Sequence, residues 1–111
     1  MKRDYKLFIN DIKESIDLIG GYLKGISEEQ FTKSLQIQDA VIRRLEIMGE
    51  ATKNIPRSLK EKNKQVDWQK ISNFRDFITH SYYEVSLNRI WKTCTEDIPK
   101  IKESLKNIQL V

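Results

Sequence analysis

The sequence is poor in cysteine, histidine, proline and glycine. Its 111 residues include one cysteine, one histidine, two prolines and four glycines. The lone Cys94 excludes an intrachain disulfide and any site built on several cysteine ligands. With only one histidine beside it, the chain also lacks the ligands of a structural zinc site. Few prolines and glycines leave long uninterrupted segments, which favour helices over a fold with many turns.

Long apolar runs are missing too. No stretch approaches the roughly 18 to 20 apolar residues that are needed to cross a membrane. The basic start, from Met1 to Lys6, is followed by alternating charges and lacks the apolar core of a signal peptide. We therefore expect a cytoplasmic protein. A chain of this length has enough residues for one hydrophobic core, so we expect a single domain over residues 1–111.

The charge balance is moderately basic. Lysine and arginine number 20 against 16 acidic residues, which gives a net charge of +4. An excess of this size suits a polyanionic partner such as nucleic acid, but it does not require one, because many basic proteins bind no nucleic acid.

Apolar residues recur at intervals of three and four along most of the chain, which is the spacing of one face of a helix. The pattern predicts four main helices: about residues 4–23, about 35–54, one that begins at Trp68 and runs through the stretch 71–83, and one that carries the apolar residues from Leu87 to Leu105. The polar and basic stretch 56–64 reads as one helical turn and a loop. The sequence therefore predicts an all-α fold, an up-and-down bundle of four main helices with a short extra helical segment.

Local signals predict where these helices begin and end. Asp67 and Ser86 are expected to cap the third and fourth helices. Ser27 opens a capping box, which predicts a short helix between the first two long ones. Pro56 is expected to end the second helix, and Pro99 should kink or split the fourth.

The stretch 71–83 concentrates groups that suit chemistry on a phosphodiester. It holds the only histidine, His80, with Arg75 five residues before it and Tyr82 two residues after it. Asp76 follows the arginine and could orient either Arg75 or His80. A histidine can give or take a proton near neutral pH, and an arginine can hold a phosphate and stabilise its developing charge. If the ligand is RNA, its own 2′-hydroxyl can act as the nucleophile, without a metal, and leave a 2′,3′-cyclic phosphate and a 5′-hydroxyl.

Arg75 and His80 do not share a helix face, because five residues turn an ideal helix by about 140°. Either the helix distorts or ends near Thr79, or the pocket takes groups from two copies of the chain in a symmetric dimer. A structural interpretation of the same residues also stands. On spacing alone, a lone histidine near a helix end more often caps a helix or packs in a core, and Arg75 with Asp76 would then form an ordinary surface pair.

Several blocks of the sequence resemble the HepT-like toxins, a branch of the HEPN superfamily of helical domains. Arg75, His80 and Tyr82 match the spacing of that family's signature, and residues 39–51 resemble a second block of the family. Residues 66–71 and 97–99 also fall where the family has similar residues, so the likeness covers essentially the whole chain. The chain departs from many relatives at position 81, which is serine in place of an acidic residue.

The resemblance implies a dimeric, metal-independent endoribonuclease that acts as the toxin of a two-gene toxin–antitoxin module. Arg75 and His80 would be catalytic, and Asp76 would be the supporting polar residue. The partner would be an MntA-type nucleotidyltransferase antitoxin, which uses ATP to add AMP to Tyr82 and so silences the toxin; no other cofactor is implied. AMP at Tyr82 would put a negative phosphate two residues from His80, where it would occupy or repel the place of the substrate phosphate.

A second interpretation keeps the same fold without the chemistry: a non-catalytic HEPN dimer that docks a nucleotidyltransferase. The intact pair of Arg75 and His80 favours catalysis, since an inactive relative would more often have lost one of them.

Residues outside the motif have both functional and structural interpretations. Glu46 and Glu50 lie one helical turn apart and could reach Arg75 across the bundle, although solvated or bridging carboxylates are the more usual outcome. Gly49 between them either allows two helices to approach closely or is simply a tolerated helical glycine. The basic stretch 57–64 could receive RNA phosphates, but a solvated charged loop is more common.

Overall fold

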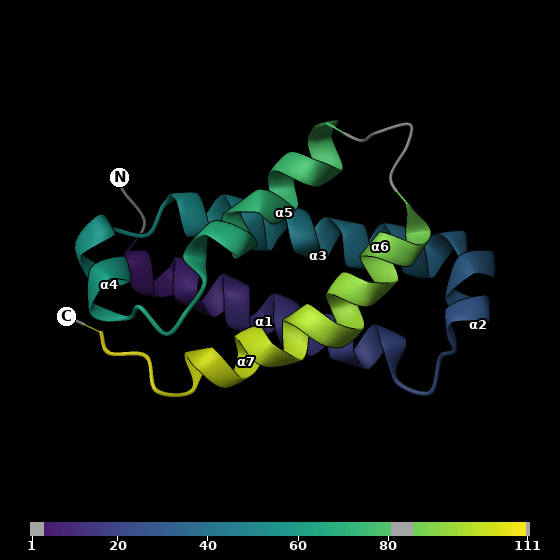
Figure 1. Ribbon diagram of the computed structural model, residues 1–111, viewed down its shortest axis with the longest axis horizontal. Coiled ribbons are helices and arrows are strands. Elements are labelled where there is room, and N and C mark those ends of the chain that lie inside the picture. Colours follow the sequence, from purple (N-terminus) through teal and green to yellow (C-terminus); the bar gives the residue numbers. More distant parts are fainter. Residues whose placement is uncertain (1–3, 81–85, 111) are drawn as a thin grey trace.

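A computed structural model of the chain describes residues 4–80 and 86–110, with the side chains of Thr79 and His80 excepted. Over these residues the chain is entirely helical, which confirms the predicted all-α class (Figure 1). The elements are α1 (Tyr5–Leu23), α2 (Glu28–Lys33), α3 (Leu35–Lys53), α4 (Arg57–Lys62), α5 (Trp68–His80), α6 (Leu87–Lys92), the π-helix η1 (Thr93–Asp97) and α7 (Ile98–Leu105). Within the described ranges, no helix is both long enough and apolar enough to span a membrane.

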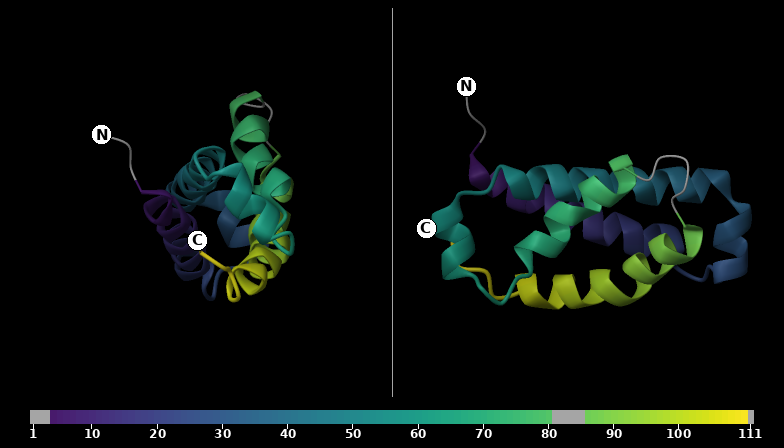
Figure 2. Two further views of the ribbon diagram at one scale, coloured as in Figure 1. Left: turned by 90° about the vertical axis from the view of Figure 1, so that its left-hand side faces the viewer. Right: turned by 45° about the horizontal axis from the view of Figure 1, so that its top comes forward.

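The two longest helices, α1 and α3, lie side by side along the long axis of the molecule. The molecule measures 43 × 27 × 23 Å. On one side α5 packs across α3, and on the other side α7 packs against α1. Seen from the end, α1, α3, α5 and α7 surround one core (Figure 2). The short helix α2 bridges α3 and α6 at one end of the molecule.

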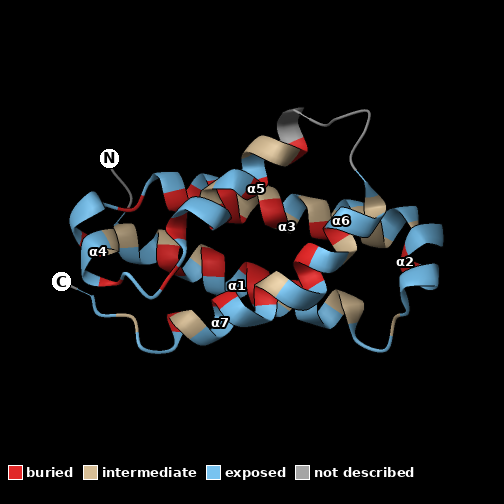
Figure 3. Cartoon of the chain, in the orientation of Figure 1, coloured by how far each residue is buried: buried red, intermediate tan, exposed pale blue. Residues whose placement is uncertain are grey.

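The core consists of the apolar stripes that the sequence predicted. The buried residues form inward-facing bands on the long helices, while the outer faces are exposed (Figure 3). The main contributors are Ile9, Ile12, Ile16 and Ile19 of α1, Val41, Leu45 and Met48 of α3, Ile71, Phe74 and Ile78 of α5, and Ile98, Ile101 and Leu105 of α7. Each such side chain contributes about 1.5–3 kcal/mol relative to an exposed one, so these stripes hold the helices together.

The predicted helix starts are confirmed by their capping hydrogen bonds. The side chains of Ser27, Asp67 and Ser86 each accept a hydrogen bond from the backbone amide three residues later, at 3.1, 3.1 and 3.3 Å. The Ser27 amide in turn donates to the side-chain oxygen of Gln30 at 2.9 Å, which completes the capping box of α2. The cap at Asp67 matters most for function, because it fixes where α5 begins.

The predicted break near Pro99 takes the form of a π-helix. The wider turn of η1 separates α6 from α7, and Pro99 lies in the first turn of α7, where its missing N–H costs no hydrogen bond. Cys94 of η1 is buried. Burial, reinforced by the negative charge of Asp97, raises the pKa of the Cys94 thiol to about 12. The thiol therefore stays protonated at physiological pH and is a poor nucleophile.

A buried asparagine, which the sequence did not single out, ties the start of α5 to the end of the chain. The Asn63 side chain donates from Nδ2 to the carbonyl of Gln109 at 2.9 Å and accepts from the Gln109 amide at 2.6 Å. The indole of Trp68, the first residue of α5, donates to the Asn63 carbonyl at 3.0 Å. These bonds satisfy a fully buried polar side chain and join residues 63–68 to Gln109, which is distant in sequence.

Candidate functional site

Arg75 lies in the middle of α5, on the side that faces α3. Its Nε lies 2.8 Å from Oε2 of Glu50, and the two side chains keep 45% and 58% of their surface exposed. The carboxylate therefore holds one edge of the guanidinium, while much of the arginine side chain stays open to solvent. A guanidinium carries five N–H donors in a fixed fork, so donors remain for a phosphate oxygen.

The close packing of α3 against α5 at this point depends on Gly49. A Cβ atom added at Gly49 would lie 2.7 Å from both the Cβ and the backbone nitrogen of Arg75. Real Cβ atoms do not approach other atoms this closely, so no larger residue fits without moving a helix. Of the two roles predicted for Gly49, the structure confirms close helix approach. The backbone of Arg75 thus rests directly on the backbone of α3.

A hollow of about 330 Å³ opens beside this ion pair. It is lined by Phe8, Asp11, Arg43, Glu46, Ile47, Glu50, Ala51 and Arg75. Three of these side chains are acidic and two are cationic, so the hollow itself is a poor place for an anion. A phosphate is expected instead at the N–H groups of Arg75 that Glu50 does not occupy, because 45% of the arginine side chain is exposed. The ion pair with Glu50 thus fixes the position of the Arg75 side chain.

Asp76 pairs with α3 and not with its neighbour Arg75. Its Oδ1 lies 3.0 Å from Nζ of Lys53, near the end of α3. Consecutive residues of a helix project about 100° apart, which is why the carboxylate that reaches Arg75 comes from Glu50 on another helix. Asp76 and Lys53 form a second polar link between α3 and α5, one turn along from the first.

The backbone of α5 continues as a helix to His80. Arg75 and His80 therefore belong to one helix and remain about 140° apart around its axis, as the sequence predicted. The α-helical geometry is retained between them, so no distortion of α5 brings the two positions onto one face. Tyr82, the residue predicted to be modified, lies outside the described residues, as does the side chain of His80.

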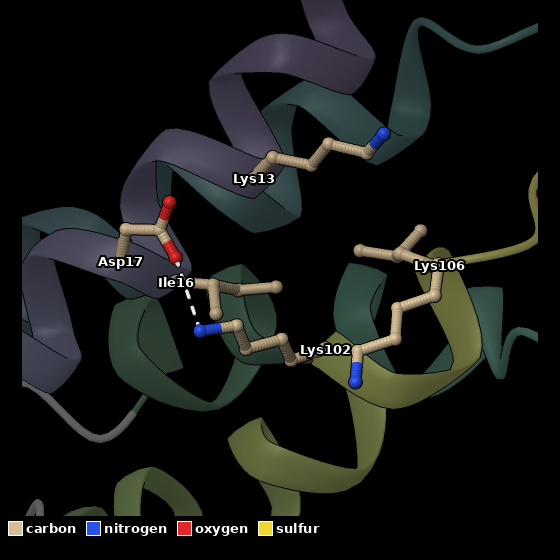
Figure 4. A pocket seen from close by; sticks show the side chains of 6 residues that line it. Lys13, Ile16, Asp17, Lys102 and Lys106 are labelled. Carbon is tan, nitrogen blue, oxygen red and sulfur yellow. Dashed lines mark ion pairs between the residues drawn. The ribbon is translucent and has the colours of Figure 1, made fainter.

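A separate hollow of about 210 Å³ lies between α1 and α7 (Figure 4). Three lysines, Lys13, Lys102 and Lys106, surround its apolar floor, and Lys102 pairs with Asp17 at 3.4 Å. No residue of α5 lines this hollow. Within residues 4–80 and 86–110, no three acidic, cysteine or histidine residues gather as metal ligands would.

Comparison with known proteins identifies consistent relatives. The family model for ribonuclease HepT-like proteins matches residues 12–108. A probable ribonuclease HepT of Thermococcus cleftensis is 39% identical over 109 residues, which cover 98% of this chain and 99% of that protein. A putative RNase of Caldanaerobacter subterraneus is 36% identical over 101 residues, 91% of this chain and 90% of that protein.

A longer relative shares the same segment. A gamma-glutamylcyclotransferase and putative RNase of Methanocaldococcus jannaschii is 43% identical over 108 residues, and this chain spans 49% of its length. No solved structure matches significantly.

Proposed function

This chain belongs to the HepT-like ribonuclease family, and on that premise we propose that it is a metal-independent endoribonuclease. The observation that carries the proposal is the setting of Arg75. Glu50 holds the guanidinium on one edge, Gly49 supports its backbone, and the remaining surface is open to solvent. His80, the only histidine of the chain, follows on the same helix.

The proposed reaction transfers a phosphoryl group within the RNA. The imidazole of His80 takes the proton of a 2′-hydroxyl, whose oxygen attacks the adjacent phosphorus. The bond from phosphorus to the 5′-oxygen breaks, and that oxygen takes up a proton from an imidazolium. The products are a 2′,3′-cyclic phosphate and a 5′-hydroxyl. Arg75 donates hydrogen bonds to the non-bridging oxygens, whose negative charge grows in the transition state.

We further propose that the working unit is a twofold dimer. Positions 75 and 80 lie about 140° apart around the axis of one helix, so a pocket that uses both gains from a second copy of α5 beside the first. Each pocket would then combine the arginine of one protomer with the histidine of its partner. Each subunit would contribute an up-and-down bundle of four helical segments, with α1, α3 and α5 as three of them and α6 to α7 as the fourth.

The proposed biological role is that of a toxin in a two-gene toxin–antitoxin module. The antitoxin would be a nucleotidyltransferase that transfers AMP from ATP to the hydroxyl of Tyr82. Family membership supports this role, as does a phenol two residues beyond the proposed acid–base group. The added phosphate would repel the RNA phosphate from His80 and fill its space.

Tyr82→Phe is expected to escape this silencing. Phenylalanine lacks the hydroxyl that accepts AMP, so the variant should keep cutting RNA after incubation with the nucleotidyltransferase and ATP, while the wild type stops. Residual RNA cleavage after incubation, together with intact-protein mass spectrometry, measures the effect. Tyr83→Phe is the matched control and should be silenced like the wild type. Equal silencing of Tyr82→Phe would move the modification to another residue.

Glu50→Gln is expected to lower kcat by about tenfold to a hundredfold, because a catalytic arginine that loses its fixed position stabilises the transition state less well. The free energy of unfolding should change by less than about 1 kcal/mol, since the ion pair is partly exposed. Single-turnover cleavage and urea denaturation measure the two effects. Glu61→Gln, which breaks the exposed pair with Arg57, is the control and should leave kcat unchanged. An unchanged kcat in Glu50→Gln would show that Arg75 needs no such support.

A further inference from the structure

The side of α5 that faces away from Arg75 borders a second, larger groove. The groove measures about 500 Å³ and lies between α5 on one side and α6 with η1 on the other. The residues that matter here are Lys70, Asn73 and Phe77 of α5, and Arg89, Lys92 and Asp97 across from them. Residues 75 and 77 are about 200° apart around the helix, so the groove is distinct from the hollow beside Glu50.

An arginine lies over an aromatic ring in this groove. Cζ of Arg89 is 4.3 Å from the centroid of the Phe77 ring, which is the geometry of a cation–π contact. Phe77 is held from below by the buried ring of Phe74, edge to face at 6.3 Å. The guanidinium of Arg89 is thus supported on one side by a fixed ring, while Arg89 itself is exposed.

The open positive charge of the groove lies at its α6 edge. Among the residues that the structure describes, neither Arg89 nor Lys92 forms an ion pair with a carboxylate. Lys70, by contrast, is paired with Asp97 at 3.1 Å, so the η1 end of the groove is already neutralised. Glu96 also lines that end. An anionic group is therefore expected beside Arg89 and Lys92, three residues apart on one face of α6.

The groove also runs towards the proposed site of cleavage. Asn73, Phe77 and position 80 follow one another by four and three residues, so they share one stripe of α5. An RNA strand that meets the groove at Phe77 is consequently about one helical turn from the residue proposed to move protons.

We propose that this groove is a subsite for the nucleotide next to the cleaved phosphodiester. The base stacks on the guanidinium of Arg89, above Phe77, and Lys92 contacts a phosphate. Stacking on aromatic rings and guanidinium planes is how proteins commonly hold unpaired RNA bases, so the substrate is a single-stranded segment. This inference rests on the proposed ribonuclease function. A second copy of the chain matches the positive edge of the groove less well than RNA does, because each copy itself carries a net charge of +4.

Arg89→Gln tests the subsite. The substitution removes both the planar cation and its charge, and it should raise KM for a short single-stranded RNA about tenfold, since one stacked base contributes about that much to binding. The kcat should stay within about twofold of wild type, because a remote contact present in both ground and transition state acts on KM. Arg44→Gln is the matched control, because it removes the same charge from α3. Arg44 lines neither the groove nor the hollow beside Glu50, so this substitution should leave KM unchanged.

Abasic substrates separate stacking from charge. A set of oligonucleotides, each with one abasic ribose, should contain one position next to the cut where the missing base raises the wild-type KM about tenfold. In Arg89→Gln the same substrate should give no further loss. Arg89→Lys should keep the salt dependence of binding and lose the base dependence, because lysine keeps the charge without the plane.

Failure of this inference is distinct from failure of the proposed function. If the wild type cleaves RNA and Arg89→Gln has an unchanged KM, the subsite is refuted and the ribonuclease stands. The same holds if Arg89→Gln alters the oligomeric state in size-exclusion chromatography, since the groove would then be an interface between copies. If the wild type cleaves no RNA at all, the ribonuclease and the subsite fall together.

Discussion

Replacing His80 with alanine is expected to lower the rate of RNA cleavage by about 10²- to 10⁴-fold, the usual contribution of a positioned acid–base group. The measurement is growth of a bacterial host on induction without the antitoxin, with total RNA analysed alongside. Wild type and Tyr82→Phe should arrest growth and fragment RNA, because both keep His80 and Arg75. His80→Ala should do neither.

The His80→Ala result has meaning only at equal expression and with the fold intact, which immunoblotting and the far-UV circular dichroism of the purified variant establish. If all three proteins leave growth and RNA unaffected, the catalytic proposal loses its basis. A helical dimer that docks a nucleotidyltransferase would then describe the chain better.

Gly49→Ala is expected to destabilise the protein by about 1–3 kcal/mol, the usual cost of an extra methyl group in a packed interior. The new Cβ would lie 2.7 Å from the Cβ and backbone nitrogen of Arg75, so α3 and α5 must move apart. The same movement shifts Arg75, and RNA cleavage should fall more than the fraction of folded protein does. Urea denaturation gives the free energy of unfolding, and single-turnover cleavage of the folded variant gives the rate.

Gly20→Ala is the matched control for Gly49→Ala. Gly20 also lies within a long helix, but a Cβ there meets no atom within 4 Å. Alanine should stabilise the protein at this position by about 0.4–1 kcal/mol, because it restricts the unfolded chain. If Gly49→Ala proves as stable as Gly20→Ala and cleaves RNA at the wild-type rate, the contact between α3 and α5 does not fix Arg75.

The helices and their starts were predictable from the sequence because they depend on neighbours a few residues away. A cap such as Asp67 is defined by its own side chain and the amide three residues later, and the apolar stripes need only a period of three to four. The break near Pro99 was equally local, but its form was not. Whether a proline kinks a helix or is accommodated by a π-helix such as η1 depends on the packing around it.

The partners within the site were harder to predict because they come from packing between helices. The sequence offered Asp76 as a neighbour for Arg75 and left Glu50 as the less usual choice. The structure pairs Arg75 with Glu50 and Asp76 with Lys53. Both pairs follow from the angle and distance at which α5 crosses α3, and Gly49 allows the close approach. Which residue of α3 reaches the arginine therefore depends on how two helices pack, and no local pattern reveals it.

The hydrogen bonds of Asn63 bear on how this protein can be handled in the laboratory. They connect Gln109 to Asn63, whose carbonyl accepts a hydrogen bond from Trp68 at the start of α5, the helix that carries Arg75. A deletion that removes residue 109 would remove both hydrogen bonds between the buried Asn63 side chain and Gln109. Loss of these bonds would loosen the start of α5, the helix that carries Arg75.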